Sequence, residues 1–138
     1  MPVVDTDDLL EEKEQLKLQE IIRTKGLEYF SEAEARVLSE LKLKGYIIST
    51  GGSAVYYDEA MEMLRGCCVV VYLEASVERL LRNIRNLDSR GITLRPGQSF
   101  RDLYEERCPL YEKYADITIK TDGQTPASIC REIRDRLP

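Results

Sequence analysis

Residues 47–53, Ile-Ile-Ser-Thr-Gly-Gly-Ser, carry the most informative local pattern in the chain. The apolar run from Tyr46 to Ile48 predicts a buried strand, which ends in two hydroxyl residues and two glycines. Gly51 and Gly52 allow positive φ angles and a close approach by another group. In open α/β sheets, ligands bind just past the carboxyl ends of the strands. The stretch therefore predicts either a ligand-binding turn or an ordinary connection from a strand to a helix.

The composition is that of one globular domain. The chain has 138 residues, of which 43% are hydrophobic and 33% are charged, which argues against disorder and against a membrane span. Residues 1–5 show no signal-peptide pattern. There is no histidine, and the four cysteines have no metal-binding spacing (Cys67, Cys68, Cys108 and Cys130). We therefore expect a protein of the reducing cytoplasm without structural zinc.

Charge is distributed unevenly along the chain. The net charge of −5 argues against nucleic acid as a general partner. Residues 1–45 contain eleven acidic and seven basic side chains, whereas residues 79–107 contain seven arginines and four acidic side chains. Such an arginine-rich segment is often only the solvated face of helices. Because it contains arginine and no lysine, bidentate recognition of an anion is the alternative.

Hydrophobic periodicity and capping residues predict strands that alternate with helices. The expected strands lie around residues 3–4, 46–50, 68–73 and 117–120. The expected helices cover about residues 7–15, 18–26, 27–44, 58–65, 77–86, 99–107 and 126 onward. Thr6 or Asp7 is expected to cap the first helix and Gly45 to end the third. Residues 87–98 are too rich in glycine, proline and charge for a regular element.

This alternation predicts an α/β fold of three layers, in which helices cover both faces of a parallel sheet. The strand at 68–73 is apolar throughout, so it is expected to be central. A nucleotide-binding domain of this kind normally begins with a strand and a phosphate loop. The sequence contains no G-x-x-x-x-G-K-[ST] motif.

Several short motifs occur in one order along nearly the whole chain. They are Asp5-Thr6-Asp7, Phe30…Glu34, Ser49-Thr50-Gly51-Gly52, Val71-Tyr72-Leu73, Arg95-Pro96, Glu106-Arg107-Cys108-Pro109-Leu110-Tyr111, Ala115-Asp116-Ile117-Thr118 and Thr121-Asp122. Together they resemble the shikimate kinase family of P-loop small-molecule kinases. The resemblance implies a single shikimate-kinase-like domain over residues 1–138, truncated at its N-terminus so that the first strand is missing. A lid loop is expected at about residues 87–99.

The resemblance also implies an activity. The family transfers a phosphoryl group from ATP, with Mg²⁺, to a hydroxyl of shikimate, a small carbocyclic acid. We therefore expect a cytoplasmic ATP-dependent kinase that acts on shikimate or a related small hydroxy acid, within aromatic amino acid biosynthesis. Its partners would be this substrate and ATP, with no nucleic acid and no membrane.

Residue roles follow from the same resemblance. Asp5 and Ser49 would lie near Mg²⁺ through water. Asp7 would accept hydrogen bonds from substrate hydroxyls, including the one that attacks. Gly51 and Gly52 would donate backbone N–H groups to the substrate, and Arg107 would bind the substrate carboxylate. Arg95 would be the lid arginine. Gln124-Thr125-Pro126 would lie along the adenine.

These residue types also suit phosphoryl transfer on chemical grounds. The reaction needs alignment and charge compensation more than covalent chemistry. A carboxylate can orient the attacking hydroxyl and take its proton. An arginine on a mobile loop adds positive charge as the site closes. The alternatives are helix capping for Asp5 and Asp7, a surface position for Arg107 and a plain loop charge for Arg95. Arg90 competes with Arg95 for the lid role.

The chain departs from the family pattern at several positions. Ser31 stands where the family has a substrate-binding arginine, and Ser53 replaces the third glycine of the turn. The lid motif continues from Arg95-Pro96 to Gly97, and the phosphate loop is absent. A non-catalytic fragment that keeps the fold but cannot bind ATP, or a related kinase with another substrate, therefore remain alternatives. Because the family's first strand separates the strands at 46–50 and 68–73, we expect no pairing between these two.

Overall fold

The structure, a computed structural model, describes residues 1–84, 92 and 94–138. Its Cα atoms group into two compact units. Of the described residues, unit 1 comprises 1–61 and 92, and unit 2 comprises 62–84 and 94–138. Arg90 and the other residues at 87–91 and 93 of the predicted lid loop lie outside the described residues.

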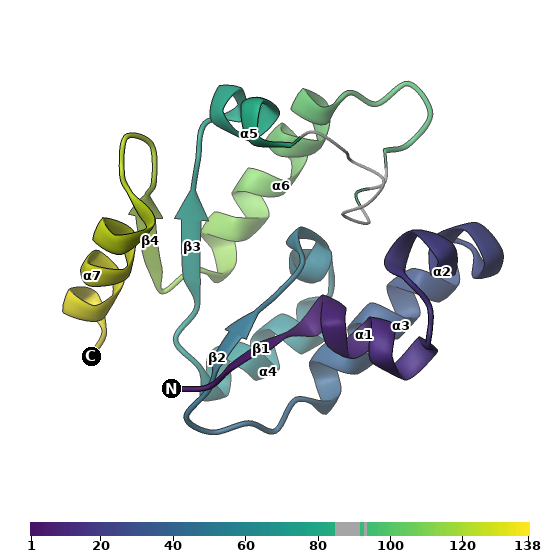
Figure 1. The fold of residues 1–138 in the computed structure, drawn as a ribbon, viewed down its shortest axis with the longest axis horizontal. Coiled ribbons are helices and arrows are strands. Elements are labelled where there is room, and N and C mark those ends of the chain that lie inside the picture. The colour runs from purple at the N-terminus through teal and green to yellow at the C-terminus, as the bar shows by residue number, and fades with distance from the viewer. Residues whose placement is uncertain (85–91, 93) are drawn as a thin grey trace. The chain divides into compact units, whose positions relative to one another are not determined.

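Unit 1 contains two parallel strands and the helices that follow each of them (Figure 1). The elements in order are β1 (Val3–Asp5), α1 (Thr6–Glu14), α2 (Leu18–Lys25), α3 (Leu27–Glu40), β2 (Ile47–Ser49) and the 3₁₀ helix η1 (Gly52–Tyr56). Helix α4 (Asp58–Cys67) begins in this unit. Val3 pairs with Ile47 and Asp5 with Ser49, so both strands end at the same edge of the sheet.

The core of unit 1 is formed by three helices. Apolar side chains at helical spacing on α1, α2 and α3 are buried against one another: Leu10, Leu18, Ile21, Phe30, Ala33 and Val37. Asp5 caps α1, because its carboxylate accepts a hydrogen bond from the N–H of Asp7 at 2.8 Å. This packing holds α1 and α3 side by side beyond the ends of the strands.

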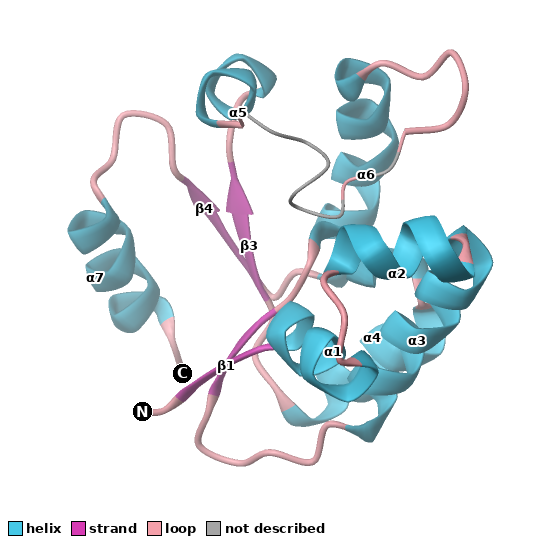
Figure 2. Ribbon diagram, turned by 45° about the vertical axis from the view of Figure 1, so that its right-hand side comes forward, coloured by secondary structure: helices cyan, strands magenta, loops and turns pink. Residues whose placement is uncertain are grey.

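Unit 2 repeats the strand and helix pattern (Figure 2). Its elements are β3 (Val71–Glu74), α5 (Val77–Asn83), α6 (Phe100–Tyr114), β4 (Ile117–Lys120) and α7 (Pro126–Arg136). Strands β3 and β4 are parallel, with Tyr72 opposite Thr118. The Tyr72 ring contacts Tyr111 of α6 at a centroid distance of 5.1 Å. Helices α6 and α7 lie on opposite sides of this strand pair, as the layered prediction requires.

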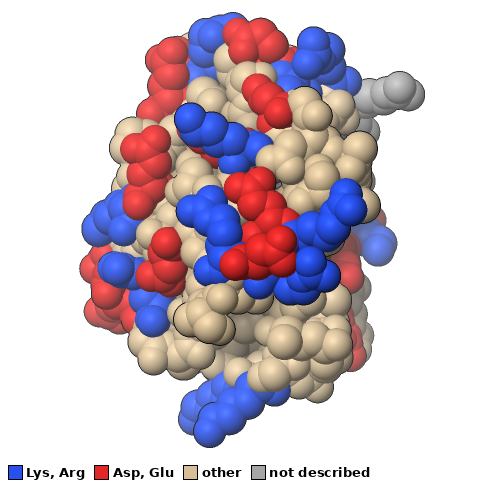
Figure 3. All heavy atoms as spheres, turned by 90° about the vertical axis from the view of Figure 1, so that its left-hand side faces the viewer, with Lys and Arg blue, Asp and Glu red and all other residues tan. Residues whose placement is uncertain are grey.

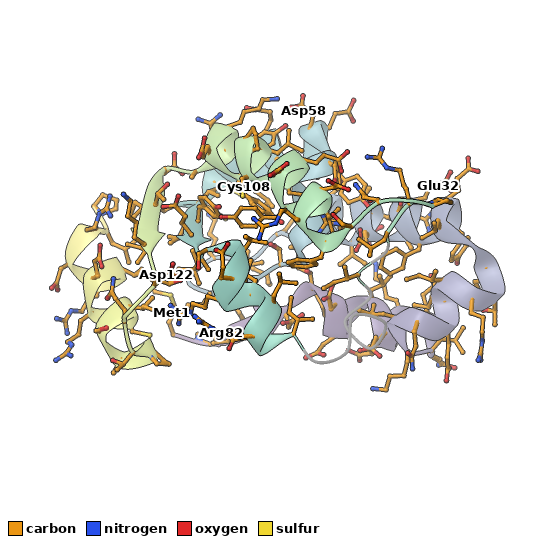
Figure 4. All side chains as sticks on the ribbon, turned by 90° about the horizontal axis from the view of Figure 1, so that it is seen from above. Met1, Glu32, Asp58, Arg82, Cys108 and Asp122 are labelled. Carbon is orange, nitrogen blue, oxygen red and sulfur yellow. The ribbon has the colours of Figure 1, made fainter. Side chains whose placement is uncertain are left out.

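Two hydrogen bonds join the loops that follow β3 and β4 in unit 2. The N–H of Ser76 donates to Asp122 Oδ1 at 3.2 Å, and the hydroxyl of Thr121 donates to the carbonyl oxygen of Glu74 at 2.8 Å. Figure 4 labels Asp122 in this loop and Cys108 on α6. The four cysteines are free thiols in the structure.

Several expected boundaries were wrong. The first helix is capped by Asp5 and not by Thr6 or Asp7, because Asp5 has the extended backbone that lets its side chain turn back. Helix α3 ends at Glu40, well before Gly45, because Leu41 is extended. Helix α6 runs beyond Arg107 to Tyr114, where Tyr111 gains the contact with Tyr72.

The two apolar strand predictions were also only partly correct. Strand β2 is not buried, since Ile47 is 52% exposed, and β3 is shorter than residues 68–73, with Leu73 52% exposed. Among the described residues each of these strands has one hydrogen-bonded neighbour, which leaves an open edge. The expected lack of pairing between residues 46–50 and 68–73 concerns strands of both units and stays a prediction.

Surface charge is mixed. The face drawn in Figure 3 shows acidic and basic side chains interspersed. On α7, Arg134 pairs with Asp135 and Arg136 with Glu132. None of the described helices is long and apolar enough to cross a membrane.

Burial in unit 2 gives a direct test of the core. Ile119 on β4 is fully buried, whereas Ile47 on β2 is 52% exposed. We predict that Ile119→Ala lowers the free energy of unfolding by about 2–5 kcal/mol, because it leaves a cavity. The matched Ile47→Ala change is expected to cost less than about 1 kcal/mol. Urea unfolding measures both, and equal losses would contradict the assigned core.

Candidate active site

The candidate site in unit 1 starts from a carboxylate that bridges two strand ends. Asp5 is the last residue of β1, and it lies opposite Ser49, the last residue of β2. Its Oδ1 accepts the N–H of Asp7 at 2.8 Å, and its Oδ2 accepts the hydroxyl of Ser49 at 3.0 Å. Asp5 therefore caps α1, which was the alternative to a role near Mg²⁺. It leaves lone pairs on both oxygens for a further partner.

The next feature is the close approach of Asp7 to the glycine turn. A Cβ atom added to Gly51 would lie 3.0 Å from Asp7 Oδ1, closer than side chains normally approach. Gly51 has an ordinary φ of −65°, so any larger residue here would be opposed by the nearby Asp7 carboxylate and not by backbone conformation. Gly52 begins η1 and is exposed. Asp7 and Gly51, which were each expected to bind the substrate, thus lie next to one another in the structure.

A small pocket opens between these elements. Its wall is made by α1, α3 and the glycine turn, with the lining residues Thr6, Asp7, Glu34, Val37, Leu38, Gly51, Ser53 and Ala54. Three of the lining side chains are apolar (Val37, Leu38 and Ala54), and four are polar (Thr6, Asp7, Glu34 and Ser53). Such a mixed lining is typical of sites for small polar molecules.

Asp7 is electrostatically unusual. Partial burial, as the largest cause, and the negative charges of Asp5, Glu34, Glu11 and Asp8 together raise its pKa to about 6. A carboxyl with a pKa near 6 is mostly ionised at neutral pH and still binds a proton readily. That property suits a group that accepts a proton from a hydroxyl.

Sequence reasoning missed one part of this pocket. Glu34 is buried to 9% exposure, and its carboxylate accepts hydrogen bonds from Ser53 and Tyr57. The signal was available in the sequence, because Glu34 falls on the apolar face of α3 with Phe30 and Val37. A charged residue on such a face needs partners in the fold.

The predicted lid arginine lies in unit 2. Arg95 forms an ion pair with Glu106 of α6 at 2.5 Å, although its side chain is 71% exposed. Its backbone N–H donates to Gln98 Oε1 at 3.1 Å, in a short turn before α6. Arg107 follows Glu106 on α6 and is half-buried. Unit 2 therefore holds both predicted anion-binding arginines, on adjoining segments.

The predicted adenine segment forms the start of α7. Thr125 caps the helix, and its hydroxyl and that of Ser128 form a reciprocal capping box, with Pro126 at the first helical position. The Gln124 amide donates to the carbonyl oxygen of Lys120 at 2.7 Å and to Glu132 at 2.8 Å. The segment is thus rigidly held just past the carboxyl end of β4.

A magnesium ion is compatible with the strand-end residues. Among the residues that the structure describes, no group of three or more His, Cys, Asp or Glu side chains is placed to hold a metal directly. Asp5 and Ser49 provide one carboxylate and one hydroxyl, both hard oxygen ligands. This donor set fits a largely hydrated Mg²⁺ that is bound through water.

Solved structures share the fold of this chain. The shikimate kinase from Acinetobacter baumannii in complex with shikimate superposes with a TM-score of 0.85 at 30% identity, over 99% of this chain and 81% of that one. The Aquifex aeolicus enzyme gives 0.82 at 30% identity, over 97% and 79%. The fold is therefore that of a P-loop small-molecule kinase.

Sequence comparison identifies the family within this fold. The model of the shikimate kinase family matches residues 1–138. A shikimate kinase from Dehalococcoides mccartyi is 35% identical over 98% of this chain and 78% of its own length. One from Pseudomonas paraeruginosa is 37% identical over 96% and 79%. The chain belongs to the shikimate kinase family.

The raised pKa of Asp7 predicts a stability effect with a definite sign. Because the folded chain holds this proton more tightly than the unfolded chain, its contribution to stability is lost as pH rises from about 4 to about 6. Asp7→Asn should therefore raise the free energy of unfolding at pH 7.5 by about 1–2 kcal/mol, discounted for solvent exposure, and should change little at pH 4.

Asp8→Asn is the matched control for this prediction. Asp8 is exposed in the first turn of α1, where a negative charge favours the helix. Its removal should lower stability by about 0.3–1 kcal/mol. Urea unfolding without Mg²⁺ measures both variants. A loss of stability in the Asp7 variant at pH 7.5 would contradict the assigned environment of Asp7.

Proposed function

We propose that this chain forms the acceptor and lid parts of an ATP-dependent kinase that phosphorylates a hydroxyl of shikimate or a related small hydroxy acid. The observation that carries the proposal is the Asp7 carboxylate beside Gly51 in the unit 1 pocket of a shikimate kinase family member. ATP is the co-substrate and the cytoplasm is the compartment, in keeping with four free thiols. The reaction would belong to aromatic amino acid biosynthesis.

Asp7 is the catalytic carboxylate in this proposal. Its oxygens accept hydrogen bonds from the acceptor hydroxyls, which fixes the attacking oxygen, and it takes the proton as the new bond to phosphorus forms. Backbone N–H groups of Gly51 and Gly52 hold the acceptor against it. Since the pKa of Asp7 is about 6, the ionised form that can accept the proton is lost as pH falls through that value.

Charge compensation falls to other groups. Asp5 and Ser49 would hold Mg²⁺ through water, and the ion would supply positive charge to the phosphates. Arg107 anchors the acceptor carboxylate, and Arg95 leaves Glu106 to stabilise the transferring phosphoryl group. The segment Gln124-Thr125-Pro126 lies along the adenine. The ion pair of Arg95 is exposed, so its release costs little.

Ser31 points to weaker recognition of the acceptor carboxylate. The family has an arginine at this position, and a hydrogen bond to a charged group is worth about 1.5–3 kcal/mol. We predict that Ser31→Arg tightens shikimate binding by about tenfold to a hundredfold, measured by calorimetry. Ser39→Arg adds the same charge at an exposed position of α3 and should have little effect. Equal affinities of the unaltered and Ser31→Arg chains would argue for Arg107 as a sufficient anchor.

The nucleotide site provides the test of the proposed reaction. ATP phosphates are normally held by backbone N–H groups of a glycine-rich loop and by its lysine, and the 138 residues contain no such motif. We predict that these residues alone show no saturable ATP binding at sub-millimolar concentration. A chain in which a strand and phosphate loop precede residue 1 should bind ATP and phosphorylate shikimate.

Two results would contradict this prediction. Tight ATP binding by the 138 residues would mean that the phosphates bind elsewhere. Failure of the extended chain to bind ATP would favour the second candidate function, a non-catalytic member that keeps the fold. In the active chain, Asp7→Asn should abolish transfer and leave ATP binding unchanged, whereas Asp5→Asn should weaken its dependence on Mg²⁺.

A further inference from the structure

Two neighbouring cysteines lie close together where helix α4 ends. Cys67 is the last residue of α4, and Cys68 lies in the bend that follows it. Their sulfur atoms are 3.6 Å apart. Neighbouring side chains within a helix point in different directions, so the two thiols meet because the helix stops between them. They form a vicinal dithiol in unit 2.

The dithiol is accessible from solvent. Cys67 is exposed and Cys68 is partly exposed. The residues on either side, Gly66 and Val69, are exposed as well, and a Cβ atom added to Gly66 would meet no neighbouring side chain within 4 Å. A small molecule can therefore reach both sulfur atoms.

The contacts made by the two sulfur atoms are weak. The thiol of Cys67 donates to the carbonyl oxygen of Met63 at 3.4 Å, and the two thiols contact each other. Thiols are weak donors and acceptors, so replacing these contacts costs little. The backbone is held separately, because the N–H of Cys68 donates to the carbonyl oxygen of Leu64 at 2.7 Å. A ligand can thus take both sulfurs while the end of α4 keeps its backbone hydrogen bond.

The spacing suits a bridging atom better than a direct disulfide. Consecutive Cα atoms across a trans peptide are about 3.8 Å apart, whereas disulfides usually join Cα atoms at about 4.4–6.8 Å. An atom inserted between the sulfurs relieves this constraint. With a bond of about 2.3 Å to each sulfur, as in metal thiolates, it would span the 3.6 Å separation at an angle of about 100°.

The number of ligands and their protonation favour one class of bridging atom. In the part of the chain that the structure describes, no group of three or more His, Cys, Asp or Glu side chains could hold a metal ion. Burial, with the neighbouring Cys67, raises the pKa of Cys68, so this thiol keeps its proton at neutral pH. A metal ion needs thiolates and more ligands than two. A trivalent arsenic atom that carries one organic group needs two further bonds and exchanges directly with S–H.

We propose that Cys67 and Cys68 form a binding site for monosubstituted trivalent arsenicals, compounds of the class R–As(OH)₂. Each sulfur replaces one hydroxyl on arsenic. Two S–H bonds and two As–O bonds break, two As–S bonds form, and the protons leave with the hydroxyls as two water molecules. Arsenic stays trivalent, so no oxidant or reductant is needed. This binding does not depend on the kinase activity.

Phenylarsine oxide, which hydrates to a compound of this class, is the probe for the full chain. We expect the intact mass to show one phenylarsenic group per chain, with the titratable thiols falling from four to two. Cys67→Ser and Cys68→Ser should each weaken binding by at least about a hundredfold, because the second As–S bond forms within the chain at a high effective concentration. Competition with dithiothreitol measures the affinity.

Cys108→Ser and Cys130→Ser are the matched controls. Cys108 lies on α6 and Cys130 on α7, and each is the single thiol of its helix. Both variants should bind one phenylarsenic group with unaltered affinity. The monothiol glutathione should leave the group in place at concentrations at which dithiothreitol removes it.

Several results would overturn the proposal. Equal affinities of the unaltered chain and either the Cys67 or the Cys68 variant would mean that one sulfur suffices. Removal by glutathione would mean the same. Loss of binding in the Cys108 or Cys130 variant would place the site elsewhere. Tighter binding of Zn²⁺ than of the arsenical, lost in both Cys67→Ser and Cys68→Ser, would assign the dithiol to a metal ion instead.

Discussion

The parallel pairing of β1 with β2 is the constraint on which the candidate site depends. It places Asp5 opposite Ser49, and the Asp5 carboxylate then joins the two strand ends through one hydroxyl and one backbone N–H. That N–H belongs to Asp7, so the same carboxylate fixes the start of α1. A shift of register by one residue would turn these side chains to the other face of the sheet and separate Asp7 from Gly51.

This geometry brings like charges together at a cost in stability. The charges of Asp5, Glu34, Glu11 and Asp8 all disfavour ionisation of Asp7, and partial burial is the largest contribution. The cost is tolerated because the surrounding helices bury a core that does not involve the carboxylates. Active-site groups are commonly held in conditions that destabilise the folded chain in this way.

Elements with strong local signals were predictable from the sequence. The caps at Ser76, Ser99 and Thr125 and the strand at 117–120 all occur where their residues indicated. Prediction failed where tertiary contacts decide, as at the C-terminal half of α6, which Tyr111 stabilises through Tyr72. Motif order led to Asp7 and Gly51, which meet in the structure. Ser53 in η1 and Tyr57 just after it both donate to Glu34, and this 3₁₀ conformation has no comparable sequence signal.

The two serines that depart from the family pattern are best considered together. At position 31 a cation is replaced by a neutral side chain, and at position 53 a neutral donor is added beside the buried Glu34. A hydroxyl satisfies a carboxylate without cancelling its charge, whereas a guanidinium does both. Relative to an arginine-containing pocket, this one loses a positive charge while keeping its carboxylates oriented. On the proposed function, we therefore expect acceptors to be recognised through their hydroxyl groups more than through a carboxylate, with positions 31 and 53 on α3 and η1 as the source of this preference.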